Sequence, residues 1–414
     1  MYFSRVFILI FSILSIYCAE AYAQGAVKKS LFIIVDGIPP DVVERVNTPH
    51  LDEIASVGGY THAYMGGEKN GYSQTPTISA VGYNSLLTGT WANKHNVWGN
   101  GIKDPNYHYW TIFRFMEEQY PDKRTAIFST WLDNRTKLIG EGLPQNNYFM
   151  LDYHFDGFEH DTVNFPHGPD RKFIYEIDEH VADQAAEYVK FNAPDMSWVY
   201  LEFTDDMGHM FGDSPEMDEA VRIADAQVGR IWEAIEYREV NFNEDWLIFI
   251  TTDHGRDAET GKNHGGQSER ERAIWITTNA QGLNPYFEQE VPGIVSIFPT
   301  LVRHHDLELP REQAFELDGA PLTGEVSIAH GEAILQDESI QLKWDAFAES
   351  GSVKVWLSRS NQFANGQPDE YELMAEVPIE EEGYRLDISD QPSDFYKIVL
   401  EGPHNTLNRW AMRE

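Results

Sequence analysis

The sequence predicts an α/β protein with a mostly parallel sheet sandwiched by helices, followed by a small C-terminal all-β sandwich. Two observations lead to this prediction. Up to about residue 324, short apolar runs alternate with amphipathic helical stretches, which is typical of a parallel sheet covered on both faces. Beyond that point the helical pattern fades, and alternating segments separated by turn residues replace it.

The α/β prediction depends on five short apolar runs that have the length and β-branching of buried strands. They are Ser30–Val35, Thr125–Thr130, Trp198–Phe203, Trp246–Thr251 and Ala273–Thr277. Between these runs lie helical patterns, of which Met217–Tyr237 is the clearest. One apolar face runs along it, made by Ala220, Ile223, Ala224, Val228, Ile231, Trp232 and Ile235.

The C-terminal part shows alternation with a period of two instead. Its clearest segments are Ser339–Trp344, Ser352–Leu357 and Phe395–Leu400, separated by Gly, Asn, Pro and Asp. This pattern is similar to that of a fibronectin type III or immunoglobulin-like domain. We therefore expect an α/β domain over residues 24–328 and a β-sandwich over residues 332–414.

The first residues have the pattern of an export signal. Arg5 supplies a basic start, Val6–Tyr17 an apolar stretch, and Ala21-Tyr22-Ala23 a small-x-small cleavage motif. The alternative is an uncleaved anchor, but the apolar stretch is short for a membrane span. We expect a signal peptide over residues 1–23, a periplasmic or secreted protein, and no stable membrane insertion.

Charge and cysteine content exclude several classes of partner and site. The formal net charge of −36 repels nucleic acid polymers and anionic membranes, so we expect a small-molecule substrate instead. Cys18 is the single cysteine and lies inside the predicted signal. The mature protein is therefore expected to have no disulfide, thiolate ligand or cysteine nucleophile.

Aspartates follow three of the predicted strands at their carboxyl ends. They are Asp36, Asp205 and Asp253. In an open α/β sheet the ligand site lies beyond these ends of the strands. An aspartate after a strand is usually only a turn or cap residue. Three of them at one edge would repel each other unless a cation lay among them.

Histidines accompany two of these aspartates. Asp205 and His209 stand one helical turn apart, His254 follows Asp253, and His264 lies in a glycine-rich loop ten residues further on. Such a set of nitrogen and oxygen ligands suits zinc. The other histidines lack such neighbours and are expected at the surface or in the core; they include His62, His160, His304 and His305.

A serine begins another helical pattern, in the segment from Gln74 to Gly89. Ser79 stands at the helix start, where free N–H groups favour a phosphoryl oxygen, although a serine there is normally a cap. The backbone N–H of Ala80 is a candidate donor to such an oxygen. Three other hydroxyls in this segment could take the role of nucleophile in place of Ser79, those of Thr75, Thr77 and Ser85.

Together these segments resemble the alkaline phosphatase superfamily and, within it, the type I phosphodiesterase/nucleotide pyrophosphatase branch. The resemblance covers Lys28 to Thr323 and implies an alkaline-phosphatase-like fold. The motifs that carry it are LFIIVDG at Asp36, SLLTG ending at Gly89 with Lys94-His95 after it, TDDMGHMFG (Thr204–Gly212), ITTDHG (Ile250–Gly255), NHGG (Asn263–Gly266) and SIFPTLVRHHDLELP (Ser296–Pro310).

The resemblance implies two Zn²⁺ ions, with other divalent metals as alternatives. The first site would comprise Asp205, His209 and His264, and the second Asp36, Ser79, Asp253 and His254. It also implies that Ser79 is the nucleophile and forms a phosphoseryl intermediate, where the branch more often has threonine. The branch usually has asparagine three residues later, where this chain has Gly82; Asn84 or Asn100 could replace it in substrate binding.

The expected activity is that of a phosphodiesterase or nucleotide pyrophosphatase. The alternatives are a phosphomonoesterase, a sulfatase-like enzyme and a non-catalytic protein that displays the sandwich. A monoesterase would need extra positive charge, for which Arg256, Lys262 and Arg270 are candidates. Aromatic residues in the segment 99–194 are expected to form either a substrate lid or an ordinary capping layer; they are Trp110, Trp131, Tyr153, Phe155 and Phe158.

Overall fold

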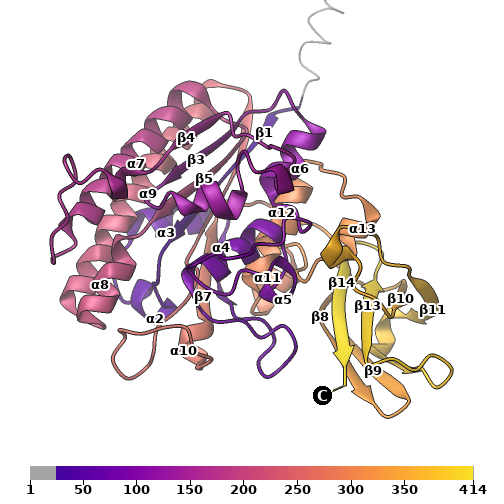
Figure 1. The fold of residues 1–414 in the computed structure, drawn as a ribbon. Coiled ribbons are helices and arrows are strands. Elements are labelled where there is room, and N and C mark those ends of the chain that lie inside the picture. The colour runs from indigo at the N-terminus through magenta and orange to yellow at the C-terminus, as the bar shows by residue number, and fades with distance from the viewer. Residues whose placement is uncertain (1–24, 414) are drawn as a thin grey trace, which may run out of the picture.

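The computed structural model describes residues 25–413 (Figure 1). The predicted signal peptide, residues 1–23, lies outside the described residues. Between residues 25 and 413, no helix combines the length and the apolar character needed to cross a membrane. The chain forms a large α/β part and, at the right of Figure 1, a smaller all-β part.

The α/β part is built on a seven-stranded sheet. Its order is β2 (Gly59–Tyr64), β7 (Ala273–Thr278), β6 (Glu244–Thr251), β1 (Val27–Val35), β5 (Met196–Leu201), β3 (Thr125–Ser129) and β4 (Tyr153–Phe155). All five predicted strands are present. The sheet is mostly parallel as expected, but β7 runs antiparallel to both β6 and β2.

Helices cover both faces of this sheet because the side chains of each central strand alternate between them. In β1, Leu31, Ile33 and Val35 pack with one core cluster and Phe32 and Ile34 with the other. The first cluster includes residues of α3 (Pro49–Val57), α7 (Lys172–Asn192) and α9 (Pro215–Asn241). The second includes residues of α4 (Ser79–Thr88), α6 (Ile112–Gln119) and α12 (Ile297–His304).

The helix predicted over Met217–Tyr237 is part of α9, which is capped by the Ser214 side chain. The α/β part also contains shorter helices: α2 (Pro40–Val43), α5 (Ala92–His95), α8 (Phe203–Phe211), α10 (Glu269–Arg272), α11 (Pro285–Gln289) and α13 (Arg311–Ala314). Two helices lie at the carboxyl edge of the sheet. Helix α8 directly follows β5, and Gly82 of α4 closely approaches Asp253, which follows β6.

The C-terminal part consists of two antiparallel sheets, as the alternation predicts. One has the order β11 (Glu372–Pro378), β10 (Ser352–Ser358), β13 (Phe395–Glu401) and β14 (Thr406–Met412). The other has the order β12 (Gly383–Asp387), β9 (Ser339–Ala346) and β8 (Ile328–Gln336). Its buried residues, such as Trp344 and Ile398, belong to the same apolar cluster as one face of the large sheet.

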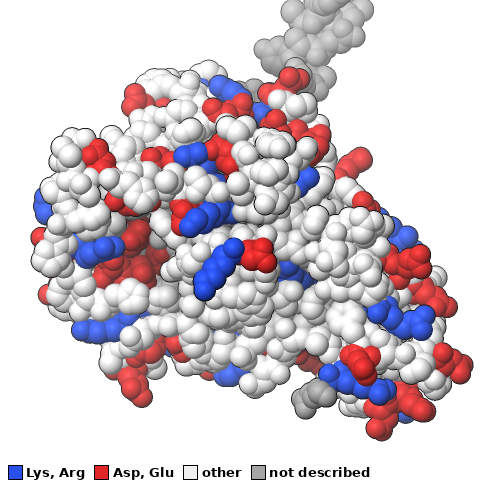
Figure 2. Space-filling view, in the orientation of Figure 1, with Lys and Arg blue, Asp and Glu red and all other residues white. Residues whose placement is uncertain are grey.

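The surface reflects the acidic composition. Figure 2 shows Asp and Glu side chains gathered at the left of the view and again on the C-terminal sheets at lower right, with Lys and Arg scattered between them.

Candidate metal centre and active site

The carboxyl edge of the central strands delivers acidic and imidazole side chains to one place. Asp36 directly follows β1, and Asp253 and His254 follow β6. The position of Asp205 differs from the prediction, because β5 already ends at Leu201 and Asp205 lies in the first turn of α8. The helix still brings the two predicted ligands together, since it places Asp205 and His209 on one face.

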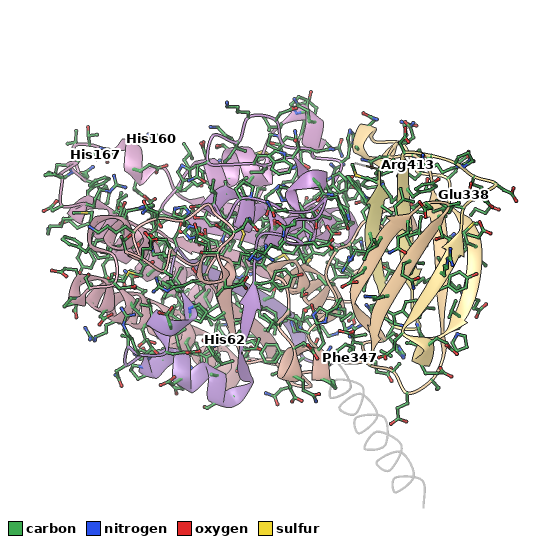
Figure 3. The ribbon with its side chains drawn as sticks, turned by 90° about the horizontal axis from the view of Figure 1, so that it is seen from below. His62, His160, His167, Glu338, Phe347 and Arg413 are labelled. Carbon is green, nitrogen blue, oxygen red and sulfur yellow. The ribbon has the colours of Figure 1, made fainter. Side chains whose placement is uncertain are left out.

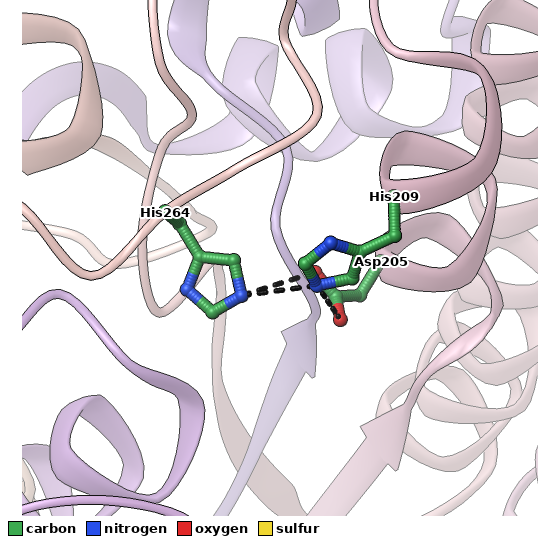
Figure 4. A group of neighbouring side chains, drawn as sticks. All are labelled: Asp205, His209 and His264. Carbon is green, nitrogen blue, oxygen red and sulfur yellow. Dashed lines mark hydrogen bonds and ion pairs between the residues drawn. The ribbon is translucent and has the colours of Figure 1, made fainter.

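One group of potential metal ligands comprises Asp205, His209 and His264 (Figure 4). The Nε2 atoms of the two histidines are 3.1 Å apart, and His209 Nε2 lies 3.3 Å from Asp205 Oδ2. Ligands held 2.0–2.1 Å from a tetrahedral zinc ion lie about 3.3 Å from one another. These spacings therefore suit a single small cation bound by all three side chains.

A second group comprises Asp36, Asp253 and His254, all deeply buried. His254 Nε2 lies 3.3 Å from Asp36 Oδ1 and 3.3 Å from Asp253 Oδ2. Each of these three atoms is buried without any hydrogen-bond partner. Buried polar atoms are rarely left unpaired, so three that converge on one point fit a cation that would bind all of them.

Hydrogen bonds on the far side hold these ligands in place. The Nδ1 atom of His254 contacts the Gly255 carbonyl at 2.9 Å, and that of His264 contacts the Thr77 carbonyl at 2.9 Å. Because a carbonyl only accepts, both rings carry their proton on Nδ1 and leave Nε2 free for a metal. Asp36 accepts hydrogen bonds at its other oxygen from the hydroxyls of Tyr83 and Tyr200.

The buried carboxylates of the second group have too little positive charge beside them. Burial raises the pKa of Asp253 well above its usual range, and the neighbouring charge of Asp36 raises it further. Burial acts to lower the pKa of His254, but the carboxylates around it outweigh this effect and raise the pKa to about 9. Divalent cations would replace the proton in this role.

Asp205 has a cationic neighbour. Burial would raise the pKa of Asp205, but the Arg256 guanidinium outweighs it and holds the pKa well below the usual range. Arg256 also donates to the Gly37 carbonyl at 2.8 Å and is itself buried. This arginine is therefore occupied in fixing Asp205.

Ser79 is the first residue of α4, and 5% of it is exposed. It lines a cavity of about 480 Å³ together with Asp36 and Asp205. Its hydroxyl makes no hydrogen bond to any other described residue. The structure thus brings Ser79 to both ligand groups.

The competing hydroxyls do not line this cavity. That of Thr77 donates to the Gly266 carbonyl at 2.9 Å, and that of Ser85 donates to the Val81 carbonyl at 2.7 Å. The Thr75 hydroxyl is buried without a partner. Only Ser79 combines a free hydroxyl with a place in the cavity.

The two candidate substrate-binding residues lie beside the serine. The Ala80 N–H donates to Asn100 Oδ1 at 3.0 Å, so this N–H is already paired. Because the Asn100 oxygen accepts that bond, its amide NH₂ is left as the donor, and Asn100 lines the cavity with Ser79. Asn84 is buried and does not line the cavity.

Packing against Asp253 explains why position 82 is a glycine. A Cβ atom there would lie 2.7 Å from the Asp253 carbonyl oxygen and 2.9 Å from its Cβ. Only glycine lets α4 approach Asp253 so closely. An asparagine at this position is thus excluded by the fold, and Asn100 is the asparagine that reaches the serine.

The remaining wall of the cavity comes from residues that sequence reasoning missed. They include Glu159, His167, Arg171 and Glu202. His160, expected to be an ordinary surface or core histidine, also lines it; Figure 3 shows His160 and His167 together at one end of the molecule. The composition of this segment could not reveal its position, because a loop far from Ser79 in sequence folds over the edge of the sheet.

Among the five aromatic candidates, only Trp131 lines the cavity. Tyr153 stacks on Tyr188 of α7, while Phe155 and Phe158 pack around His180. Trp110 packs on Phe115 of α6. Four of them therefore pack in the layer over the sheet, and Trp131 alone is placed at the cavity that contains Ser79.

Comparisons with known proteins agree on the type of fold. The model of the type I phosphodiesterase/nucleotide pyrophosphatase family matches residues 30–300. An inactive variant of murine ectonucleotide pyrophosphatase/phosphodiesterase 5, solved in complex with AMP, is 14% identical, with 68% of this chain and 96% of that chain covered and a TM-score of 0.50.

Two further solved structures are similar over more of the chain. A putative sulfatase from Bacteroides thetaiotaomicron is 12% identical, with 84% of this chain and 85% of that chain covered and a TM-score of 0.51. Ps i-CgsB in complex with k-i-k-neocarrahexaose is 16% identical, with 84% and 86% covered and a TM-score of 0.51. At such low identity these likenesses show the fold alone.

Proposed function

Because the chain belongs to the type I phosphodiesterase/nucleotide pyrophosphatase family, and is therefore a hydrolase of the alkaline phosphatase superfamily, we propose that it is an exported, two-zinc phosphodiesterase with Ser79 as nucleophile. The observation that carries this proposal is the convergence of three unpaired buried atoms, on Asp36, Asp253 and His254, in a centre whose cavity also contains Ser79.

The residues fit two metal ions. Asp205, His209 and His264 would hold one, and Asp36, Asp253 and His254 would hold the other, with Ser79 completing the second site. When bound, the ions would supply Lewis acidity, which lowers the pKa of the serine hydroxyl and offsets phosphoryl charge.

The side chains of the protein would then carry out two displacements. The Ser79 oxygen forms a bond to phosphorus as the bond to the leaving alcohol breaks, and water cleaves the resulting phosphoserine. The amide NH₂ of Asn100 would donate to a phosphoryl oxygen in both steps. The dipole of α4, which begins at Ser79, favours the same negative charge.

The cavity suits a diester better than a monoester. A monoester carries an additional negative charge, for which Arg256, Lys262 and Arg270 were the candidates. Arg256 is paired with Asp205, the Lys262 ammonium donates to the Met210 carbonyl, and Arg270 pairs with Asp41 and Asp213. None of the three lines the cavity, and Arg171, which does line it, is already paired with Asp206 and Glu202, so no unpaired lysine or arginine of the cavity wall meets the second charge of a monoester.

We also propose a division into a catalytic domain over residues 24–328 and a sandwich over residues 332–414 that packs rather than binds. A buried ion pair links the parts: Lys397 of the sandwich contacts Glu316 of the α/β part at 2.7 Å. Buried charges that lose their partner are costly. A chain truncated after residue 328 is therefore expected to aggregate; a soluble, active fragment would contradict this division of roles.

The activity is tested with purified mature protein on bis-p-nitrophenyl phosphate, p-nitrophenyl phosphate and p-nitrophenyl sulfate, with zinc and with chelator. Zinc-dependent turnover of the diester, lost in Ser79→Ala, is expected. Preferential turnover of the monoester would point to the phosphomonoesterase, and of the sulfate to a sulfatase-like enzyme. No turnover with both metals bound would favour a binding protein.

The export proposal rests on residues 1–23 and needs its own test. N-terminal sequencing of protein recovered from the periplasm or medium is expected to begin at Gln24. An uncleaved N-terminus in the cell membrane fraction would support the anchor alternative.

A further inference from the structure

The cavity that contains Ser79 has a second wall away from the metal ligands. We define this distal wall by Trp131, Glu159, Arg171 and Glu202, all of which line the same cavity as the serine. Trp131 follows β3 and Glu159 lies in a short 3-10 helix (Phe158–His160) after β4, whereas Arg171 and Glu202 directly precede α7 and α8. A phosphodiester bound at Ser79 would extend one of its ester groups toward this wall.

Glu159 is the unusual member of the distal wall. Its Oε1 atom accepts a hydrogen bond from the Leu132 N–H at 2.7 Å, which fixes the orientation of the carboxylate. Its Oε2 atom is buried and has no hydrogen-bond partner. Burial raises the pKa of Glu159, and this effect outweighs the hydrogen bond from Leu132 and the His160 imidazole, which lies 3.7 Å from Oε1.

The one ion-pair contact of Glu159 among the described residues is to Oε1, where His160 Nε2 lies 3.7 Å away, and Oε2 has no such contact. Within the described chain, Arg171 is the single lysine or arginine that lines the cavity. Its guanidinium donates to Asp206 at 2.6 Å and to Glu202 at 3.1 Å, so it is already shared between two carboxylates. The distal wall therefore has an excess of negative charge and an orphaned acceptor, both of which a cationic hydrogen-bond donor would satisfy.

Trp131 adds an aromatic surface to the same wall. It is partly exposed, and its ring packs edge-on against Tyr83, whose hydroxyl donates to Asp36. An indole beside a carboxylate attracts an ammonium group through both its π-face and the neighbouring charge. A primary ammonium also supplies the N–H donor that Glu159 Oε2 lacks, whereas a quaternary ammonium has none.

We propose that the distal wall recognises a primary ammonium group on the ester of the substrate, so that this enzyme hydrolyses aminoalkyl phosphodiesters with Glu159 as the specificity-determining residue. The proposal rests on the phosphodiesterase function above and names its substrate class. The hydrolysis itself is unchanged, because the distal wall only binds and orients the ester group.

The test compares three diesters that share glycerol phosphate: glycerophosphoethanolamine, glycerophosphocholine and glycerophosphoglycerol. Release of the alcohol by the zinc-loaded wild type is measured by mass spectrometry. We expect kcat/KM for the ethanolamine diester to exceed that for the other two about tenfold or more, as a charge-assisted hydrogen bond in a partly buried site provides. Equal rates, or a preference for the choline or glycerol diester, would overturn the proposal.

The variant Glu159→Gln keeps an oxygen for the Leu132 N–H but removes the charge. It is expected to abolish the preference, measured as the ratio of kcat/KM for the ethanolamine diester to kcat/KM for bis-p-nitrophenyl phosphate, which has no ammonium. Glu187→Gln, at an exposed position of α7 outside the cavity, is the matched control. A preference that survives in Glu159→Gln would also overturn the proposal.

A binding measurement separates this proposal from the activity itself. O-phosphoethanolamine and ethyl phosphate differ mainly in the ammonium group, and calorimetry gives the affinity of the zinc-loaded protein for each without any turnover. Tighter binding of O-phosphoethanolamine, lost in Glu159→Gln, supports the distal wall even if no diester is hydrolysed; equal affinity would refute it. Absence of turnover on bis-p-nitrophenyl phosphate counts against the phosphodiesterase function alone.

Discussion

The two groups of candidate metal ligands differ in how they are held. His254 and Asp253 are completely inaccessible, whereas 45% of the His209 side chain is exposed. The buried group follows β1 and β6 at the centre of the sheet, while the exposed group depends on α8 and a glycine-rich loop. Carboxylates that are buried in the core need a cation beside them, whereas ligands at the rim of the site can be solvated by water.

This difference suggests a division of labour. The buried group, whose Asp253 packs against Gly82 of the helix that begins at Ser79, would fix the metal that acts on the nucleophile. In the other group His209 is exposed to solvent, from which the water that cleaves the phosphoserine would come. If burial of the ligands, rather than their identity, separates the two groups, variants of the buried group should have the larger effects.

The largest effect is expected from His254→Ala. This change leaves two buried carboxylates without their imidazole, so turnover of bis-p-nitrophenyl phosphate should fall by about a thousandfold or more and one metal should be lost. His209→Ala removes a solvent-exposed ligand, and its activity should recover largely with excess zinc. Both variants are checked by their metal content, measured by mass spectrometry, and by kcat at rising zinc concentration. Equal recovery of activity in the two variants would show that burial does not distinguish the two groups of ligands.

Metal removal should destabilise the whole fold by a smaller amount. Zinc at about a thousandfold over its Kd adds roughly 4 kcal/mol to a native state that alone binds it. We expect the Tm of the protein to fall by several degrees on chelation, and by much less in His254→Ala, which has already lost the buried site. A Tm insensitive to chelator would argue against the buried metal.

The metal-free protein should also show a specific pH dependence. The folded pKa of His254, about 9, lies above the ordinary value of 6.5, so the protonated imidazole contributes stability that is present below about 6.5 and lost as the pH rises to about 9. His264 behaves oppositely, because burial and the nearby His254 lower its pKa to about 4. The chelated wild type should therefore lose Tm between pH 6.5 and 9 more steeply than chelated His254→Ala.

The smallest effect is expected from Gly82→Ala. The added methyl group would push α4 away from Asp253, which should cost about 1–3 kcal/mol of stability and reduce kcat more than it raises KM. Ala80→Gly on the same helix turn is the comparison, since it removes volume instead. Denaturant unfolding and steady-state kinetics measure both; full activity in Gly82→Ala would show that the helix can move without affecting the serine.

Much of the fold was predictable because its signals are local. Each central strand is a continuous apolar run, and α9 repeats its apolar face over many turns, so both were found nearly at their observed limits. The antiparallel direction of β7 was not predicted, because strand direction depends on the connections and not on the composition of the run.

The sequence by itself determined the central sheet, the all-β C-terminal part and the residue types that gather at the carboxyl edge, since periodicity and the short motifs around Asp36, Asp205 and Asp253 encode them. Only the tertiary structure decided that Asn100 rather than Asn84 lines the cavity with Ser79, and that Glu159 and Arg171 close this cavity. These choices depend on contacts between segments far apart in the chain, where packing distance, burial and charge act together and no local pattern records them.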